Sequence, residues 1–199
     1  MLLPLVGCAA CGSLAGPDFR GEPLFTLSGT LRGTILEKPV APHLGTLMGR
    51  LSVQPDVAGE VVRITATGFP AEFRLELHAP PPQPALQKFA DGAEGAFGVV
   101  VAVDDVNGDG TFALEGDRAA APDRFFGFGW GALLVWLSAP TAADGIVENP
   151  ARARAGYQLG RFVCGQLRLR LLEGSLPLEV SLEPEGRISY SDAMSACVQ

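Results

Sequence analysis

Hydrophobic and polar residues alternate with a period of two in four segments of the chain. In the clearest of them Phe73, Leu75 and Leu77 alternate with polar residues, and the pattern recurs over residues 62–67, 167–171 and 178–182. Successive side chains of a β-strand point to opposite faces of the sheet, so this alternation is typical of a strand with one face in a core and the other in water. The pattern predicts half-buried antiparallel strands in these four places.

Four other segments indicate strands through their apolar and β-branched composition rather than through strict alternation. These are residues 25–35, 46–53, 97–103 and 132–137. The run over 97–103 is almost entirely apolar, which predicts a central strand that is buried on both faces. The run over 132–137 is also apolar, but it is far too short to cross a bilayer.

Turn-forming residues separate these segments and suit a chain of many short strands. The 199 residues include 25 glycines and 16 prolines, a composition that disfavours long helices. We therefore predict an all-β fold, an antiparallel β-sandwich of about eight strands that spans residues 21–199 as a single domain. A small β-barrel is the alternative.

The charge of the chain argues against nucleic acid as a partner. The net charge is −7, and no basic cluster suited to phosphate neutralisation stands out in the sequence. An acidic surface is compatible with cation binding and with solubility, although it specifies neither.

The N-terminus carries a short lipidation motif. Leu5, Val6, Gly7 and Cys8 fit the bacterial lipobox, in which the cysteine is acylated and becomes the new N-terminus. Too few residues precede Cys8 for a signal peptide, so we expect the true start to lie upstream. We interpret residues 1–20 as a lipobox remnant and a flexible tether. An apolar strand with a chance cysteine is the alternative.

The most specific motif follows the apolar run over 97–103. Asp105, Asn107 and Asp109 are spaced two residues apart, a glycine stands at the sixth position, and Thr111 would offer its backbone carbonyl at the seventh. This is the first half of a calcium-binding loop of the D-x-[DN]-x-[DN]-G type. The glutamate expected at the twelfth position is missing, and the neighbouring Glu115 is a candidate replacement. We expect weak Ca²⁺ binding, with a dissociation constant of about 10⁻⁴ to 10⁻³ M.

A plain turn is the alternative to the metal site. Asn107-Gly108 and Asp109-Gly110 are both strong turn dipeptides, and a hairpin could use either of them without any metal.

Two cysteines near the C-terminus suggest a disulfide. In an exported protein Cys164 and Cys197 could form a bridge that closes the C-terminal segment, and two buried free thiols are the alternative. Zinc is disfavoured, because no second pair of ligands follows Cys8 and Cys11.

The chain resembles a group of uncharacterised bacterial lipoproteins. In these proteins a lipobox cysteine precedes a β-sandwich similar to transthyretin or to the regulatory domain of carboxypeptidases. The matching residues are Leu5 to Cys8, the segment 25–31, and the stretch 101–110 with its dockerin-like D-x-N-x-D-G loop. The resemblance implies an exported module at the outer membrane or in the periplasm, and it implies no activity.

No catalytic signature is present. The sequence has no G-x-S-x-G elbow, P-loop or dinucleotide fingerprint, and its two histidines, His43 and His78, have no evident partner serine. The aromatic segment 125–130 fits either core packing or an apolar platform for a glycan, a peptide or a partner protein. Our leading hypothesis is a non-enzymatic, lipid-anchored envelope module with a structural calcium loop. A secreted accessory or inhibitor domain that binds through residues 125–130 is the rival hypothesis.

Overall fold

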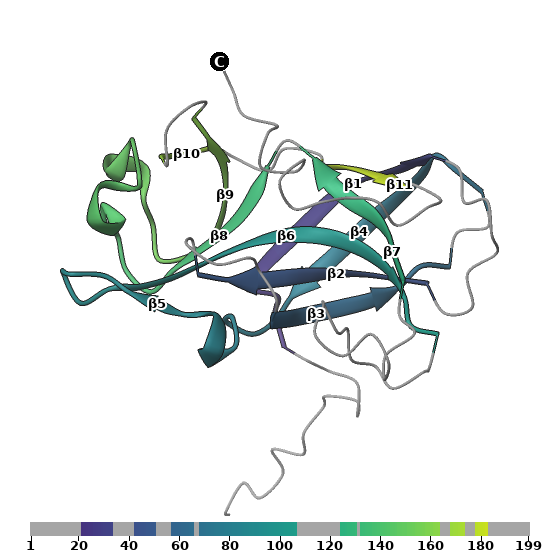
Figure 1. The fold of residues 1–199 in the computed structure, drawn as a ribbon, viewed down its shortest axis with the longest axis horizontal. Helices are drawn as coiled ribbons and strands as arrows, with labels where there is room; N and C mark the ends of the chain where they lie inside the picture. Colours follow the sequence, from purple (N-terminus) through teal and green to yellow (C-terminus); the bar gives the residue numbers. More distant parts are fainter. Residues whose placement is uncertain are drawn as a thin grey trace, which may run out of the picture.

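The regular secondary structure of the described part of the chain is β-strand, apart from three single turns of 3₁₀-helix. The computed structural model describes residues 21–33, 42–50, 57–65, 68–106, 124–130, 132–163, 168–173 and 178–182 (Figure 1). The strands are β1 (Phe25–Gly33), β2 (Pro42–Gly49), β3 (Val57–Arg63), β4 (Ala71–Leu77), β5 (Gln87–Lys88), β6 (Glu94–Asp104), β7 (Arg124–Trp130), β8 (Leu133–Leu137), β9 (Gly156–Phe162), β10 (Leu169–Leu171) and β11 (Leu178–Leu182). The 3₁₀ turns are η1 (Gln83–Ala85), η2 (Ala143–Gly145) and η3 (Pro150–Arg152). The prediction of an all-β fold is confirmed.

Strand β6 is the centre of the sheet, as its apolar sequence predicts. On one side β2 pairs with it from Phe97 to Asp104. On the other side its first half pairs with β8, and its second half pairs with β7. Every residue from Gly95 to Asp104 is buried. A strand covered by neighbours along both edges and both faces needs the continuous run of small and β-branched apolar residues seen here.

The C-terminal strand β11 lies in the middle of the sheet. It is antiparallel to β7 on one side and parallel to β1 on the other, and β4 continues the sheet beyond β1. The predicted antiparallel pairing does not extend to the β1–β11 pair, which is parallel and makes the sheet mixed. Eight of the described strands form one hydrogen-bonded path in the order β10-β9-β8-β6-β7-β11-β1-β4, and β2, β3 and β5 branch from it through β6. The described sheet does not close into a barrel. Figure 1 shows β1 and β4 running obliquely across β2, β3 and β6.

Two hydrophobic cores lie on the two faces of β6. Phe97, Val99, Val101 and Val103 face one core, which we call the loop-covered core. Side chains from β8 and β10 complete it, and Ala143, Val147 and Ala153 of the long 138–155 connection cover it.

The second core, which we call the sheet-enclosed core, lies on the opposite face of β6. Ala96, Val100 and Ala102 contribute to it from β6, and leucine, valine and methionine side chains contribute from β1, β2, β4 and β11. The alternation predicted for residues 73–77, 167–171 and 178–182 is seen in the described residues, because Leu75, Leu77, Leu169, Leu171, Leu178, Val180 and Leu182 are all buried.

The alternation over residues 62–67 correctly predicted the face of the sheet on which Val62 lies, but it did not predict how exposed this residue is. Val62 pairs with the buried Leu44 of β2 and therefore shares its face. However, β3 pairs only with β2 within the described ranges, and Val62 is 38% exposed. A strand at the edge of a sheet has a covering neighbour on one side only, which leaves its apolar residues partly open to water.

Candidate functional site

The two acidic residues at the end of β6 are the most unusual buried groups in the described structure. Asp104 is 2% exposed and Asp105 is 4% exposed, and they are the only buried residues with ionisable side chains in the described ranges. Asp104 lies opposite Pro42 of β2 and Arg124 of β7 in the strand register. Burial of a carboxylate is costly unless cationic or hydrogen-bonding groups compensate the charge. Both aspartates take part in polar interactions in this structure.

The predicted metal ligands begin at this point. Asp105, the first ligand of the predicted loop, directly follows the last residue of β6, so a buried strand fixes the position of its backbone. The remaining candidates, Asn107, Asp109, Thr111 and Glu115, lie outside the described residues. Within the described residues, no group of three or more His, Cys, Asp and Glu side chains is arranged to hold a metal ion. Calcium at this loop therefore remains a prediction.

Three other predicted positions also fall outside the described ranges. They are the lipidation site Cys8 and the disulfide pair Cys164 and Cys197. The acylation and the bridge stay predictions on the strength of the sequence alone.

The aromatic segment 125–130 forms part of β7, and its described side chains belong to the interior. Phe126 is 7% exposed and packs in the sheet-enclosed core. A β-carbon at Gly127 would lie 2.7 Å from a Leu182 methyl and 2.8 Å from the Ala102 β-carbon. Glycine is therefore needed where β7 packs closely against its neighbours. For these residues the structure favours core packing over an exposed platform.

The histidines lie on different strands. His43 is on β2, opposite Arg63 of β3, while His78 follows β4 and its Nε2 atom lies 3.5 Å from the Glu76 carboxylate. No sequence motif groups the two histidines, and their positions, one on β2 and one after β4, do not group them either.

A polar corner joins the β5–β6 turn to the start of the 138–155 connection, and the sequence did not predict it. The Thr141 hydroxyl donates to Asp91 Oδ2 at 2.5 Å and accepts from the backbone N–H of Ala143 at 2.9 Å. The backbone N–H of Ala90 donates to Asp144 Oδ1 at 2.9 Å. The hydrogen bond from Thr141, together with one from the backbone N–H of Ala93, holds the pKa of Asp91 below its ordinary value.

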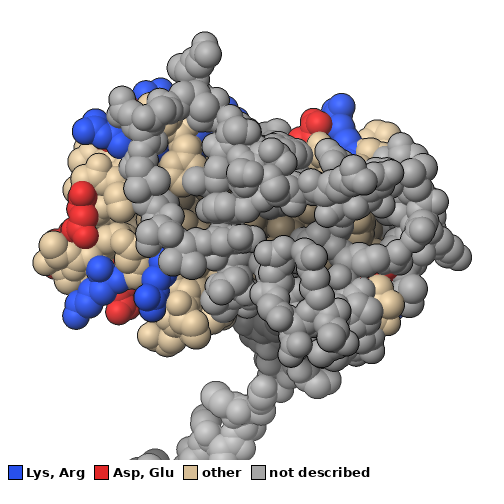
Figure 2. Space-filling view, in the orientation of Figure 1, with Lys and Arg blue, Asp and Glu red and all other residues tan. Residues whose placement is uncertain are grey.

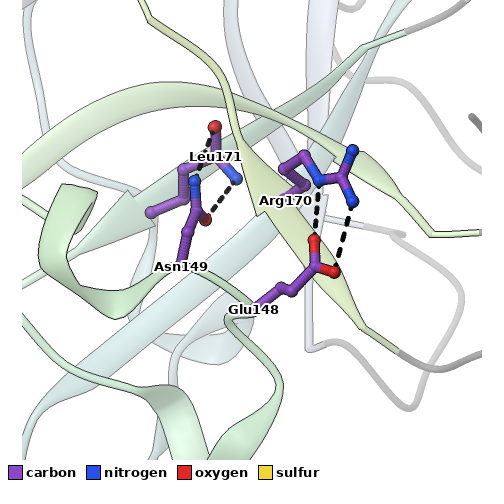
Figure 3. A network of polar contacts seen from close by, with 4 residues as sticks. All are labelled: Glu148, Asn149, Arg170 and Leu171. Atoms are coloured by element: carbon purple, nitrogen blue, oxygen red, sulfur yellow. Dashed lines mark hydrogen bonds and ion pairs between the residues drawn. The ribbon is translucent and has the colours of Figure 1, made fainter.

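A second polar network caps the outer edge of β10 (Figure 3). The side-chain amide of Asn149 donates to the carbonyl of Leu171 at 3.1 Å and accepts from the N–H of the same residue at 3.0 Å. The guanidinium of Arg170 donates to both carboxylate oxygens of Glu148, at 2.6 and 3.2 Å. This charge-assisted pair lowers the pKa of Glu148 and raises that of Arg170. Residues 146–149 thus satisfy an edge that would otherwise offer free backbone groups.

The helical content of the described chain is limited to three-residue turns. None of these is long and apolar enough to cross a membrane.

Comparisons with known proteins return no relative. No protein-family model, no curated protein and no solved structure matches this chain.

Proposed function

We propose that this chain is a non-enzymatic module of the bacterial cell envelope in which the loop from Asp105 to Thr111 binds a structural calcium ion. Cys8 would carry the lipid that attaches the module to the outer membrane. The proposal rests on the lipobox Leu5–Cys8 and on the D-x-N-x-D-G loop.

One structural observation carries the calcium part of the proposal. The two buried carboxylates of the described structure, Asp104 and Asp105, are adjacent and stand where β6 enters the predicted loop. A buried carboxylate loses hydration, and a divalent cation bound to Asp105 would offset part of that cost. A plain turn needs no acidic residue at a buried strand end, so this position favours the metal over the turn.

Calcium would act by fastening the end of β6 to the chain that follows it. The side-chain oxygens of Asp105, Asn107 and Asp109, with the carbonyl of Thr111, supply part of the six to eight oxygens that Ca²⁺ requires. Glu115 and water would supply the remainder. Because the ion would bind the folded chain, its binding energy would add to the stability of the domain.

The test is the thermal unfolding of the purified protein with and without calcium. With a dissociation constant of about 1 mM, calcium at about 10 mM would stabilise the folded state by about 1.4 kcal/mol. For a domain of this size that gain corresponds to a rise in melting temperature of about 3–5 °C. The variants Asp105→Asn and Asp109→Ala should lose the calcium-dependent rise, whatever their melting temperatures in chelator.

Asp144→Asn is the matched control. It removes one acidic charge at the other end of β6, roughly 30 Å from Asp105, and leaves an oxygen to accept from Ala90. This variant should keep the full calcium response. Equal melting temperatures of the parent protein in calcium and in chelator, or an undiminished response in Asp105→Asn, would overturn the proposal.

A further inference from the structure

The end of the molecule that holds β9 and β10 is positively charged in an otherwise acidic protein. Residues 146–173 contain five arginines and two glutamates, a net charge of +3, whereas the whole chain carries −7. Figure 2 shows lysine and arginine side chains gathered over this end, at the upper left. This positive charge is confined to one region of the chain. What the region can bind depends on which of its arginines are already paired with carboxylates.

Both glutamates of this region are already paired. Glu173 contacts Arg152 at 3.0 Å, and Glu148 receives two hydrogen bonds from Nε and Nη2 of Arg170. Nη1 of Arg170 takes no part in that pair. Neither carboxylate therefore remains as a dedicated partner for the other arginines.

Arg161 combines a buried donor that has no acceptor in the described part of the chain with a second arginine as its cross-strand neighbour. It stands directly opposite Arg170 in the antiparallel β9–β10 pair, so both side chains lie on the same face. Its Nε atom is buried and has no hydrogen-bond partner in the described part of the chain. Like charges directly opposite one another destabilise a strand pair, and a buried charged donor without an acceptor is costly as well.

Arg168 adds a third cation to this face. It lies two residues before Arg170 on the same chain segment, and its charge acts on the Glu148 carboxylate. Arg168 and Arg170 thus both act on the Glu148 carboxylate, while Arg161 faces Arg170 across the strand pair. A bound oxyanion would reduce the repulsion between these arginines, and it could also accept a hydrogen bond from the buried Nε–H of Arg161.

We propose that Arg161, Arg168 and Arg170 form a binding site for a phosphate-type oxyanion on the face of the β9–β10 pair that carries Arg161 and Arg170. The fork of Nε–H and Nη–H donors on Arg161 matches two oxygens of a phosphate group. Arg170 contributes Nη1, and Arg168 contributes longer-range attraction. The same chemistry would serve a free phosphate or the phosphate of a lipid headgroup. This inference does not depend on the calcium loop.

The experiment is calorimetric titration of the full chain with inorganic phosphate at constant ionic strength, in the presence of EDTA. Chelation keeps calcium out of the measurement, so the calcium proposal can fail without affecting this result. We expect saturable binding at one site. Arg161→Gln should weaken it by at least about tenfold, and Arg161→Lys should weaken it too, because a lysine lacks the two-pronged donor.

Arg152→Gln is the matched control, since it removes an equal charge from the same end of the molecule but from an arginine already paired with Glu173. It should change the affinity by less than about twofold. Thermal unfolding of each variant verifies that it is folded. Absence of saturable binding, or equal weakening by Arg152→Gln and Arg161→Gln, would overturn the proposal and leave only a diffuse charge effect.

A second arm identifies the source of the phosphate. Vesicles of phosphatidylglycerol should compete with inorganic phosphate if a lipid headgroup is the ligand, and their binding should also depend on Arg161. If such vesicles do not compete while inorganic phosphate still binds, the ligand is a free phosphate or a soluble phosphate ester.

Discussion

At the scale of single residues, the Thr141 hydroxyl makes two hydrogen bonds that the sequence did not predict. Its hydroxyl bridges Asp91 on one side and the backbone N–H of Ala143 on the other. Ala143 is fully buried and has a φ of 48°, a left-handed conformation that is unusual for alanine. The hydroxyl therefore helps to hold a strained turn over the loop-covered core.

Replacing that hydroxyl by a methyl group should have two measurable effects. Thr141→Val leaves the buried N–H of Ala143 without its acceptor, so the free energy of unfolding should fall by about 1–3 kcal/mol. The pKa of Asp91 should also rise towards its ordinary value of 3.8, because the hydroxyl is the largest cause of its depression. Chemical denaturation and NMR titration of the carboxyl group measure the two effects.

The sign of the pH dependence follows from the direction of that shift. A depressed carboxyl pKa stabilises the fold above the pKa of the unfolded chain, and this contribution is lost as the pH falls through the folded value. Thr141→Val should therefore flatten the acid limb of the stability curve. Thr141→Ser keeps the hydroxyl and should retain most of both effects. An unchanged Asp91 pKa in Thr141→Val would contradict this account.

At the scale of the elements, the outer edge of β10 is closed by an isolated backbone bridge at Leu169 and by a side chain at Leu171. Asn149 presents one donor and one acceptor to Leu171, as a peptide group of a neighbouring strand would. Asn149→Ala should lower the free energy of unfolding by about 1–3 kcal/mol, because the N–H of the buried Leu171 loses its acceptor.

Gln158→Ala is a suitable comparison for that variant. It removes an amide that makes one exposed hydrogen bond, to the carbonyl of Arg154. Its effect in urea denaturation should stay within about 0.5 kcal/mol. Equal losses in the two variants would mean that the amide of Asn149 does not cap the edge.

The parallel β1–β11 pair depends on a glycine. A β-carbon at Gly29 would lie only 1.9 Å from the carbonyl oxygen of Leu178, a backbone atom that cannot move aside without separating the strands. Gly29→Ala should destabilise the protein by about 3 kcal/mol or more, measured by urea denaturation.

Gly68→Ala provides the control for the methyl group itself. A β-carbon at Gly68 would meet no atom within 4 Å, so this variant should stay within about 0.5 kcal/mol of the parent protein. A small effect at Gly29 would show that the two strands can move apart at little cost.

Part of this architecture was readable from the sequence, because burial on one or both faces leaves a local pattern. The run 97–103 predicted β6 as a central strand, and the alternation over 73–77 predicted β4. Strand pairing leaves a weaker trace. Nothing near Gly29 identifies Leu178 as its neighbour, since the two residues are far apart in the chain and meet only in the folded sheet.

The candidate sites show the same contrast between local sequence patterns, which can be predicted, and contacts between distant segments, which cannot. Asp105 was found because calcium ligands recur at fixed spacing along one loop. Arg161 and Asn149 were missed, because their surroundings come from strand register and from the course of a long connection. The five arginines of residues 146–173 are spread along the chain, so they form no basic cluster in the sequence, and their spacing did not indicate that Arg161 and Arg170 face each other.

At the scale of the whole molecule, β6 connects the two cores. It pairs with β2, β5, β7 and β8, and its alternate side chains enter opposite cores. Its amides should therefore exchange with deuterium only when the whole domain unfolds, while those of the edge strands β3 and β4 should exchange through local opening. Native-state hydrogen exchange measures this order. If the amides of β4 were as strongly protected from exchange as those of β6, this would argue against β6 as the most stable strand of the sheet.

The position of β11 has a consequence for how the protein is made. Within the described chain, β11 alone joins β1 and β4 by hydrogen bonds to the other eight strands. The ribosome synthesises β11 after all of them. The pairing of β1, the first of the described strands to be made, is therefore complete only after β11 has been made. A nascent chain that ends before residue 182 therefore cannot complete the β1–β11 and β7–β11 pairs, and the two parts of the sheet are joined only after β11 has been made.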